Sequence, residues 1–248
     1  MTVFWPVPDG RVERLALARG YPFAIPDHSL LFEAGRFRPL DDPRPHLAGR
    51  TAVLAVGSNQ SPDQLARKFA HAPGTVIPVT RVWLDDFDVV YATHVTRYGS
   101  IPGNLHPAPG TRVRLSITWL DDAQLAVMHA TEIAGENYCY ARLDGVRIAI
   151  DGGTTLESVH AYVSRHGCLN HGGAAVGLAA IRAENRPHAA FGQAEALALL
   201  AVRAGHEGDL DDFIHAAIAE PQMRAARTAL MRRDALPFHW PLLTVVAR

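Results

Sequence analysis

The chain has little cysteine, little net charge and no long apolar run. Two cysteines among 248 residues cannot build a disulfide framework, so we expect a protein of the reducing cytoplasm. The formal net charge of −1 offers no overall attraction for nucleic acid or an acidic membrane surface. No apolar run approaches the roughly 20 residues that span a bilayer, and the N-terminus lacks the basic start and apolar core of a signal peptide. We therefore predict a cytoplasmic protein without a nucleic-acid or membrane partner.

Apolar residues are nevertheless frequent enough to bury a core. Hydrophobic residues make up 48% and charged residues 20% of the chain, which is typical of a folded globular protein. Seven prolines interrupt residues 1–50 and leave room for little more than one short helix near 10–19. We expect residues 1–50 to be a proline-rich arm that packs on a core built by the later chain.

The clearest local pattern lies in residues 51–69. Thr51–Val56 is typical of a buried strand, and the polar turn Gly57–Asn59 follows it. Ser61 suits a helix N-cap, and Gln64 three residues later would complete a capping box. Unpaired N–H groups at such a strand–helix turn form a site for a carboxylate or phosphate. The alternative is an ordinary turn in which glycine and asparagine only make the bend.

The middle of the chain is predicted to be rich in β-structure. In residues 112–119 apolar and polar side chains alternate, so we expect one face of this strand to be buried and the other to contact water. We expect strands at 75–79, 81–92, 111–120, 138–143, 146–150 and 159–163, a glycine-rich bend at 98–103 and a turn at 106–110.

A helix over residues 122–132 carries the main candidate for proton transfer. Asp121 and Gln124 have the spacing of a capping box at its start. Glu132 falls at its C-terminal end, where the negative end of the helix dipole disfavours a charged carboxylate. A carboxyl group that exchanges its proton readily is what general acid/base catalysis needs. The alternative is that Glu132 is exposed at a frayed helix end.

Histidine and cysteine do not form a recognisable metal site. His160, His166, Cys168 and His171 lie within twelve positions, but their spacing matches no common zinc pattern, and 13 histidines produce such groups by chance. We expect neither a metal nor a cofactor.

The end of the chain reads as helical. From about residue 172 the composition becomes rich in alanine and leucine, and residues 174–184, 193–204, 210–219 and 222–233 each show helical spacing. We expect residues 171–248 to be an all-helical extension that packs on the preceding domain or on a second copy of the chain, which would make a homodimer.

The order of these motifs resembles the γ-glutamylcyclotransferase-like family. The resemblance rests on Val56-Gly57-Ser58-Asn59 after a hydrophobic strand, the Tyr98-Gly99 bend, and a short helix ending in Glu132 with tyrosines soon after. It covers roughly residues 52–163. The family has a Tyr-Gly-Ser-Asn loop on a mixed, barrel-like sheet and one essential acidic residue across the cavity. The resemblance implies an α+β fold with flanking helices over residues 51–170.

The family also implies roles for particular residues. Glu132 would be the general acid/base, and the loop Val56–Gln60 would hold the α-carboxylate of the substrate together with Tyr98 and Gly99. The downstream tyrosine of the family would be Tyr138 or Tyr140, and the two are not distinguished. Val56 stands where the family has tyrosine, and His129 stands where an acidic residue is common.

Members of the family release 5-oxoproline from γ-glutamyl compounds. The implied activity here is the cyclisation of a γ-glutamyl amine or peptide, a small molecule that carries a carboxylate. The alternative is a non-catalytic member of the fold that binds a carboxylated small molecule or a protein partner. Glu132 favours the enzyme, whereas Val56, His129 and the extension favour the binding protein.

Overall fold

A closed β-barrel forms the centre of the computed structural model, which describes residues 6–72 and 74–248. Strand β5 pairs with β3, β3 with β7, β7 with β6, β6 with β4, and β4 returns to β5. The β3–β7 pair is parallel and the other four are antiparallel, so the barrel is mixed. The predicted α+β class with a mixed, barrel-like sheet is therefore confirmed. The strands are β3 (Thr51–Ala55), β4 (Val76–Tyr91), β5 (Gly103–Leu120), β6 (Tyr138–Ile150) and β7 (Thr155–Ser164).

Strands β4 and β5 form one long hairpin, which corrects two predictions. The runs at 75–79 and 81–92 are a single strand with a bulge between Asp85 and Phe87. The turn predicted at 106–110 lies inside β5, where Pro107 is opposite Phe87 on β4. The prolines of this segment therefore sit beside a bulge, where a missing N–H donor is tolerated.

The polar face of β5 was predicted to contact water, but it is buried. Arg114, Ser116 and Thr118 are all buried. The Ser116 hydroxyl accepts a hydrogen bond from the guanidinium of Arg81 at 2.8 Å, and the Thr118 hydroxyl donates to the Val53 carbonyl. The strand pattern is correct, but helices and the N-terminal arm cover the outer face of the barrel.

Two short helices pack on that outer face. Helices α2 (Pro62–Lys68) and α3 (Asp122–Glu132) contribute Leu65 and Met128 to a second hydrophobic cluster there. The capping box of α3 between Asp121 and Gln124 is confirmed. The one predicted for α2 is wrong: the Ser61 side chain makes no cap, and its hydroxyl has no partner among the described residues.

The N-terminal arm contributes more than the single predicted helix. Helix α1 (Arg11–Arg19) is present as expected. Strands β1 (Leu30–Glu33) and β2 (Arg36–Pro39) form a hairpin that extends the sheet, with Leu30 opposite Val79 of β4. A single 3-10 turn follows at Arg44–His46. Residues 1–5 of the predicted arm lie outside the described residues.

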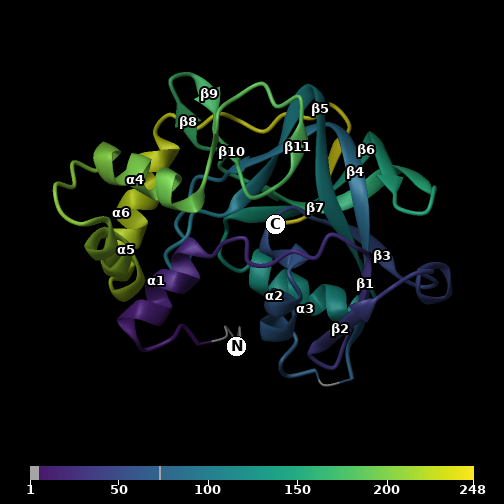
Figure 1. Ribbon diagram of the computed structural model, residues 1–248. Helices are drawn as coiled ribbons and strands as arrows, with labels where there is room; N and C mark the ends of the chain where they lie inside the picture. The colour runs from purple at the N-terminus through teal and green to yellow at the C-terminus, as the bar shows by residue number, and fades with distance from the viewer. Residues whose placement is uncertain (1–5, 73) are drawn as a thin grey trace.

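The C-terminal part is only partly helical. Helices α4 (Gln193–Arg203), α5 (Leu210–Ala219) and α6 (Pro221–Arg232) stand together beside α1 on one side of the barrel (Figure 1). The helix predicted at 174–184 is wrong, because tertiary pairing overrides the helix propensity of its alanines. Instead there are short strands: β8 (Asn170–His171), β9 (Ala174–Ala175), β10 (Gly177–Leu178), β11 (Ala183–Glu184), β12 (Ala190–Phe191) and the terminal β13 (Leu243–Ala247).

One hydrophobic cluster runs through all three parts of the chain. It joins Ala18 of α1, Leu115 inside the barrel and Phe213 of α5. Helices from the N-terminal and the C-terminal parts of the chain therefore pack against the same barrel core. None of the described helices is long and apolar enough to cross a lipid bilayer.

Candidate active site

A cavity of about 320 Å³ opens where the loop after β3 meets the ends of α2 and α3. This volume is at the lower end of the range for small-molecule sites. The loop 56–59 forms one wall, the segment 94–98 a second, and α6 contributes a residue at the side. Side chains that meet here include Tyr21, Lys68, His94, Arg97, Tyr98, Glu132, Asn137, Tyr138, Tyr162 and Arg224.

Glu132 forms a buried ion pair on the cavity wall. Its Oε1 atom accepts hydrogen bonds from the ammonium group of Lys68 and, at 3.1 Å, from Nδ2 of Asn59. The side chains of Lys68 and Glu132 are only 4% and 17% exposed. Each residue is the last of its helix, α2 or α3, so Lys68 supplies positive charge where two negative helix ends approach each other. The sequence prediction did not anticipate this partner.

The loop after β3 turns tightly against a tyrosine of the arm. Residues Ser58–Gln60 form a 3-10 turn in which the N–H groups of Gln60 and Ser61 bond to carbonyls of the loop itself. Two of the donors expected for an anion are therefore already used. A Cβ at Gly57 would lie 1.9 Å from the Tyr21 hydroxyl, so only glycine allows this approach.

Four tyrosines line the cavity together with Glu132. Burial raises the pKa of Tyr21, Tyr98, Tyr138 and Tyr162, and the charge of Glu132 raises each of them further. These phenols consequently stay protonated at neutral pH and present hydroxyl groups, not phenolates, to the cavity.

A neutral histidine also lines the cavity. His94 is 7% exposed, and its ring meets that of Tyr138 edge-on at 5.3 Å. Burial, together with the charge of Arg232, lowers the pKa of His94 to about 3. The imidazole is thus uncharged at neutral pH and adds no positive charge to the site.

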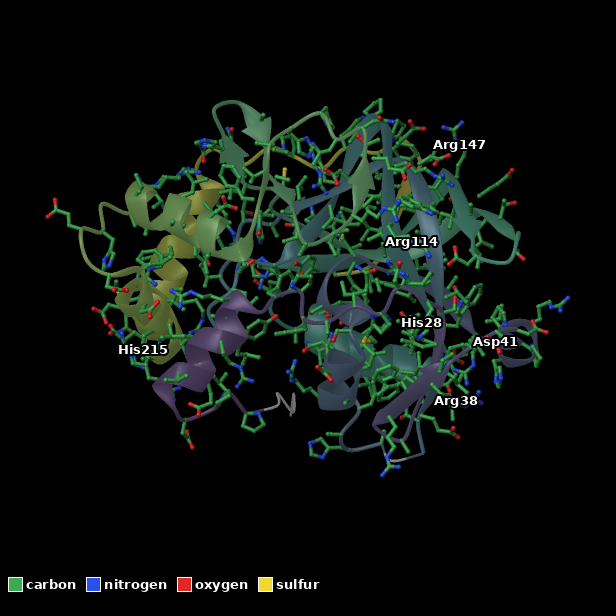
Figure 2. The ribbon with its side chains drawn as sticks, viewed as in Figure 1. His28, Arg38, Asp41, Arg114, Arg147 and His215 are labelled. Carbon is green, nitrogen blue, oxygen red and sulfur yellow. The ribbon has the colours of Figure 1, made fainter. Side chains whose placement is uncertain are left out.

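The cavity carries an excess of positive charge. Among the described lining residues Lys68, Arg97 and Arg224 are cationic and Glu132 alone is acidic. Burial lowers the pKa of Arg97, and burial and then the charge of Arg97 lower that of Arg224. Two other arginines do not line the cavity: the buried Arg114 pairs with Asp151, and the exposed Arg147 pairs with Asp86 (Figure 2). The site suits an anionic ligand.

The chain is similar to several solved structures over part of its length. A protein of Arabidopsis thaliana with a solution structure is 18% identical, covers 47% of this chain and 70% of its own, and has a TM-score of 0.36. A structure titled gamma-glutamyl cyclotransferase is 13% identical over 46% of this chain and 66% of its own, with a TM-score of 0.37. An uncharacterized protein of Homo sapiens is 15% identical over 47% and 67%, with a TM-score of 0.36. No family model and no curated protein matches the chain.

The family suggested by the sequence motifs is named in one of these titles. At such identities and TM-scores the likeness concerns part of the fold and says nothing of activity. What the site can do has to be argued from its own residues.

The structure brings most of the predicted site residues together. The residues that line the cavity are Val56, Gly57, Ser58, Asn59, Tyr98, Glu132 and Tyr138.

Three other predicted residues lie elsewhere. Gln60 is buried behind the loop, where it accepts from Arg81 and donates to the Val56 carbonyl. Gly99 makes a turn with φ +88° that packs against Ile218 of α5. Tyr140 stacks on His160 behind the barrel wall, so Tyr138 is the downstream tyrosine that reaches the cavity.

The group of histidines and cysteine between 160 and 171 is dispersed. His160 contacts Tyr140, whereas the fully buried Cys168 lies 3.6 Å from Nδ1 of His106. Burial raises the pKa of the Cys168 thiol to about 12, which makes it unreactive. Within the described part of the chain no three histidine, cysteine, aspartate or glutamate side chains lie close enough together to bind a metal ion.

Proposed function

We propose that this chain is a γ-glutamylcyclotransferase-like enzyme that cyclises a γ-glutamyl amine or peptide and releases 5-oxoproline. The observation that carries the proposal is the Glu132 carboxylate, held by Asn59 and Lys68 on the wall of a positively charged cavity. The two contacts fix the position of the carboxylate, and general base catalysis requires a base held within reach of the proton that it accepts.

The reaction needs one group that moves protons in both directions. The α-ammonium of the substrate gives a proton to Glu132, and the free amine then attacks the γ-carbonyl carbon. When the tetrahedral intermediate collapses, the bond to the departing nitrogen breaks and Glu132 returns the first proton to that nitrogen. The attacking nitrogen gives up its second proton in the same step, so the products are a neutral lactam and the released amine as its ammonium ion. Asn59 Oδ1 is buried and has no partner among the described residues, so it is available to accept a hydrogen bond from the α-ammonium.

The charged residues at the side of the cavity would hold the carboxylate of the substrate. Arg97 and Arg224 are both partly desolvated, and the charge of one disfavours the charge of the other. A bound carboxylate relieves that repulsion. Fixing it would also fold the γ-glutamyl chain back on itself, which brings amine and carbonyl together.

The test is release of 5-oxoproline from a panel of γ-glutamyl amino acids, peptides and amines. Glu132→Gln keeps the shape and the Asn59 contact but removes the proton acceptor, so we expect kcat to fall at least a hundredfold. Glu136→Gln, four residues on at the surface, is the matched control and is expected to keep wild-type rates. Equal rates in Glu132→Gln and wild type would exclude Glu132 as the acid/base.

A second function is favoured by the ion pair itself. The carboxylate of Glu132 already forms an ion pair with Lys68. A carboxylate that stays in this pair would shape a binding site and would not transfer protons. If no member of the panel is turned over, but the carboxylated compounds raise the melting temperature of the wild type, the protein is a binding member of the fold.

A further inference from the structure

Tyr21 reaches the cavity from the N-terminal arm. It follows α1 in the chain, is 5% exposed, and lines the cavity between the loop at Gly57 and the start of β5 at Gly103. Figure 1 shows α1 on the side of the barrel near α2, where the arm passes the end of the sheet. The sequence motifs gave no role to this residue.

The hydrogen bonds of its hydroxyl group leave one position open. A phenol offers two lone pairs and one proton. The Gly103 N–H donates to the Tyr21 oxygen at 2.7 Å, and the Ser58 N–H also acts on it. Both interactions use lone pairs, and neither uses the hydroxyl proton, which donates to none of the described residues in the hydrogen bonds of the structure. The proton is therefore available to a ligand in the cavity.

Tyr138 provides a direct contrast at the same residue, Gly103. Its hydroxyl donates to the Gly103 carbonyl at 3.0 Å, so its proton is already in use. Tyr21 and Tyr138 thus bind the N–H and the C=O of one residue with opposite polarity. Of the two, only Tyr21 keeps its proton for a ligand.

The Tyr21 hydroxyl and Glu132 face the same space. Burial and, to a smaller extent, the charge of the Glu132 carboxylate raise the pKa of Tyr21, so its hydroxyl remains a donor throughout the neutral range. Backbone N–H groups that donate to the phenol oxygen polarise its O–H bond, and this makes the hydroxyl a stronger hydrogen-bond donor.

We propose that Tyr21 donates a hydrogen bond to the γ-carbonyl oxygen of the substrate and stabilises the negative charge that develops there. This inference rests on the proposed cyclisation. The substrate would lie with its amine at Glu132 and its carbonyl oxygen at Tyr21. No proton is transferred to the oxygen: the hydrogen bond strengthens as the C=O becomes C–O⁻ and weakens when the intermediate collapses. A donor placed for the transition state raises kcat more than it lowers KM.

Tyr21→Phe is the variant that tests the role. It keeps the ring and removes the hydroxyl, and we expect kcat to fall about a hundredfold with KM changed less than about threefold. Tyr138→Phe is expected to lose less, about tenfold or below, because its proton is bound by Gly103. Tyr91→Phe is the control: this buried tyrosine donates to the Phe191 carbonyl outside the cavity, and its loss is expected to leave kcat unchanged.

The outcomes separate this inference from the function on which it rests. A wild type that releases no 5-oxoproline overturns the proposed function. An active wild type with an equally active Tyr21→Phe overturns only the role of Tyr21. A variant with raised KM and unchanged kcat also overturns it, because the hydroxyl would then serve substrate binding alone.

If the Tyr21→Phe protein fails to fold, a second variant tests the same role. Tyr21→3-fluorotyrosine keeps the hydroxyl and nearly the same size but makes the phenol more acidic, and hence a stronger donor. We expect kcat to change at least about twofold. A kcat indistinguishable from that of the wild type would overturn the proposal.

Discussion

Lys68 and Glu132 form an ion pair in which each charge offsets the cost of burying the other. With Lys68 removed, the largely buried Glu132 remains at the negative end of α3, with Asn59 as its remaining described donor. We expect Lys68→Met to lower the free energy of unfolding by about 1–3 kcal/mol, measured by urea denaturation at neutral pH. Adding Glu132→Gln to this variant should restore much of that loss.

The double variant separates the effect of charge from the effect of packing. If the loss came only from poorer packing of methionine, Glu132→Gln would not repair it. Additive effects of the two changes would therefore contradict the coupling between the two charges.

Local signals explain which site residues could be predicted. Glu132 ends a helix with a clear capping pattern, and the turn at Gly57 follows a strand with a clear hydrophobic pattern. Lys68 lies 64 positions from Glu132 and Tyr21 lies 82 from Gly103, so no spacing rule connects them. The one available hint was that Lys68 ends a helix just as Glu132 does. Only the packing of α2 beside α3 turns that hint into a contact.

The loop between β3 and α2 depends on the absence of one side chain. The Cβ of Gly57→Ala would meet the hydroxyl oxygen of Tyr21 at 1.9 Å and its ring at 3.0 Å, and Tyr21 is too buried to move freely. We expect a loss of about 2 kcal/mol in the free energy of unfolding, measured by urea denaturation. Gly74→Ala, at a glycine with open space around it, should be neutral.

A partner substitution tests the cause. Tyr21→Phe removes the atom of closest approach, so Gly57→Ala should be less harmful in that background than in the wild type. An equal loss in both backgrounds would show that the loop, and not the tyrosine, rejects the added methyl group.

At the level of elements, helices were more predictable than strands. Periodicity and capping residues gave α3 its bounds, residues 122–132, because those signals are local. Residues 174–184 have helical composition yet form short strands, since β10 pairs with β4 and β11 with β5. The hairpin of β1 and β2 was missed for the same reason: its partner β4 lies some 45 residues away. Such pairings depend on the barrel, which no single segment encodes.

In the whole molecule, the N-terminal arm and the C-terminal helices both contribute side chains to the cavity. Arg11 of α1 bonds to Asp212 of α5 at 2.6 Å, and Ser100 donates to the Ala18 carbonyl. Tyr21 enters the site from one end of the chain and Arg224 from the other. The resemblance identified from the motifs covers neither segment, so the parts that complete the lining are those the motifs could not describe.

His94 links the stability of this junction to pH. It lies between the barrel and the C-terminal helices, with its ring against that of Tyr138 on β6. Burial lowers its pKa, and the charges of Arg232 and His166 lower it further. Its pKa is about 3 in the folded protein, below the ordinary value of 6.5, so the unfolded chain binds a proton more readily. The stabilisation by neutral His94 is complete above pH 6.5 and is lost as the pH falls toward 3, at up to about 1.4 kcal/mol per pH unit.

We therefore expect His94→Gln to flatten the dependence of stability on pH. Urea denaturation from pH 7 to pH 4 should show the wild type losing more free energy of unfolding than the variant, because glutamine takes up no proton. His28→Gln, at an exposed position, should follow the wild-type curve. Parallel curves for wild type and His94→Gln would mean that water reaches the imidazole and that the wall of the cavity is open there. A flattened curve would tie acid unfolding to the surface on which the barrel and the C-terminal helices meet.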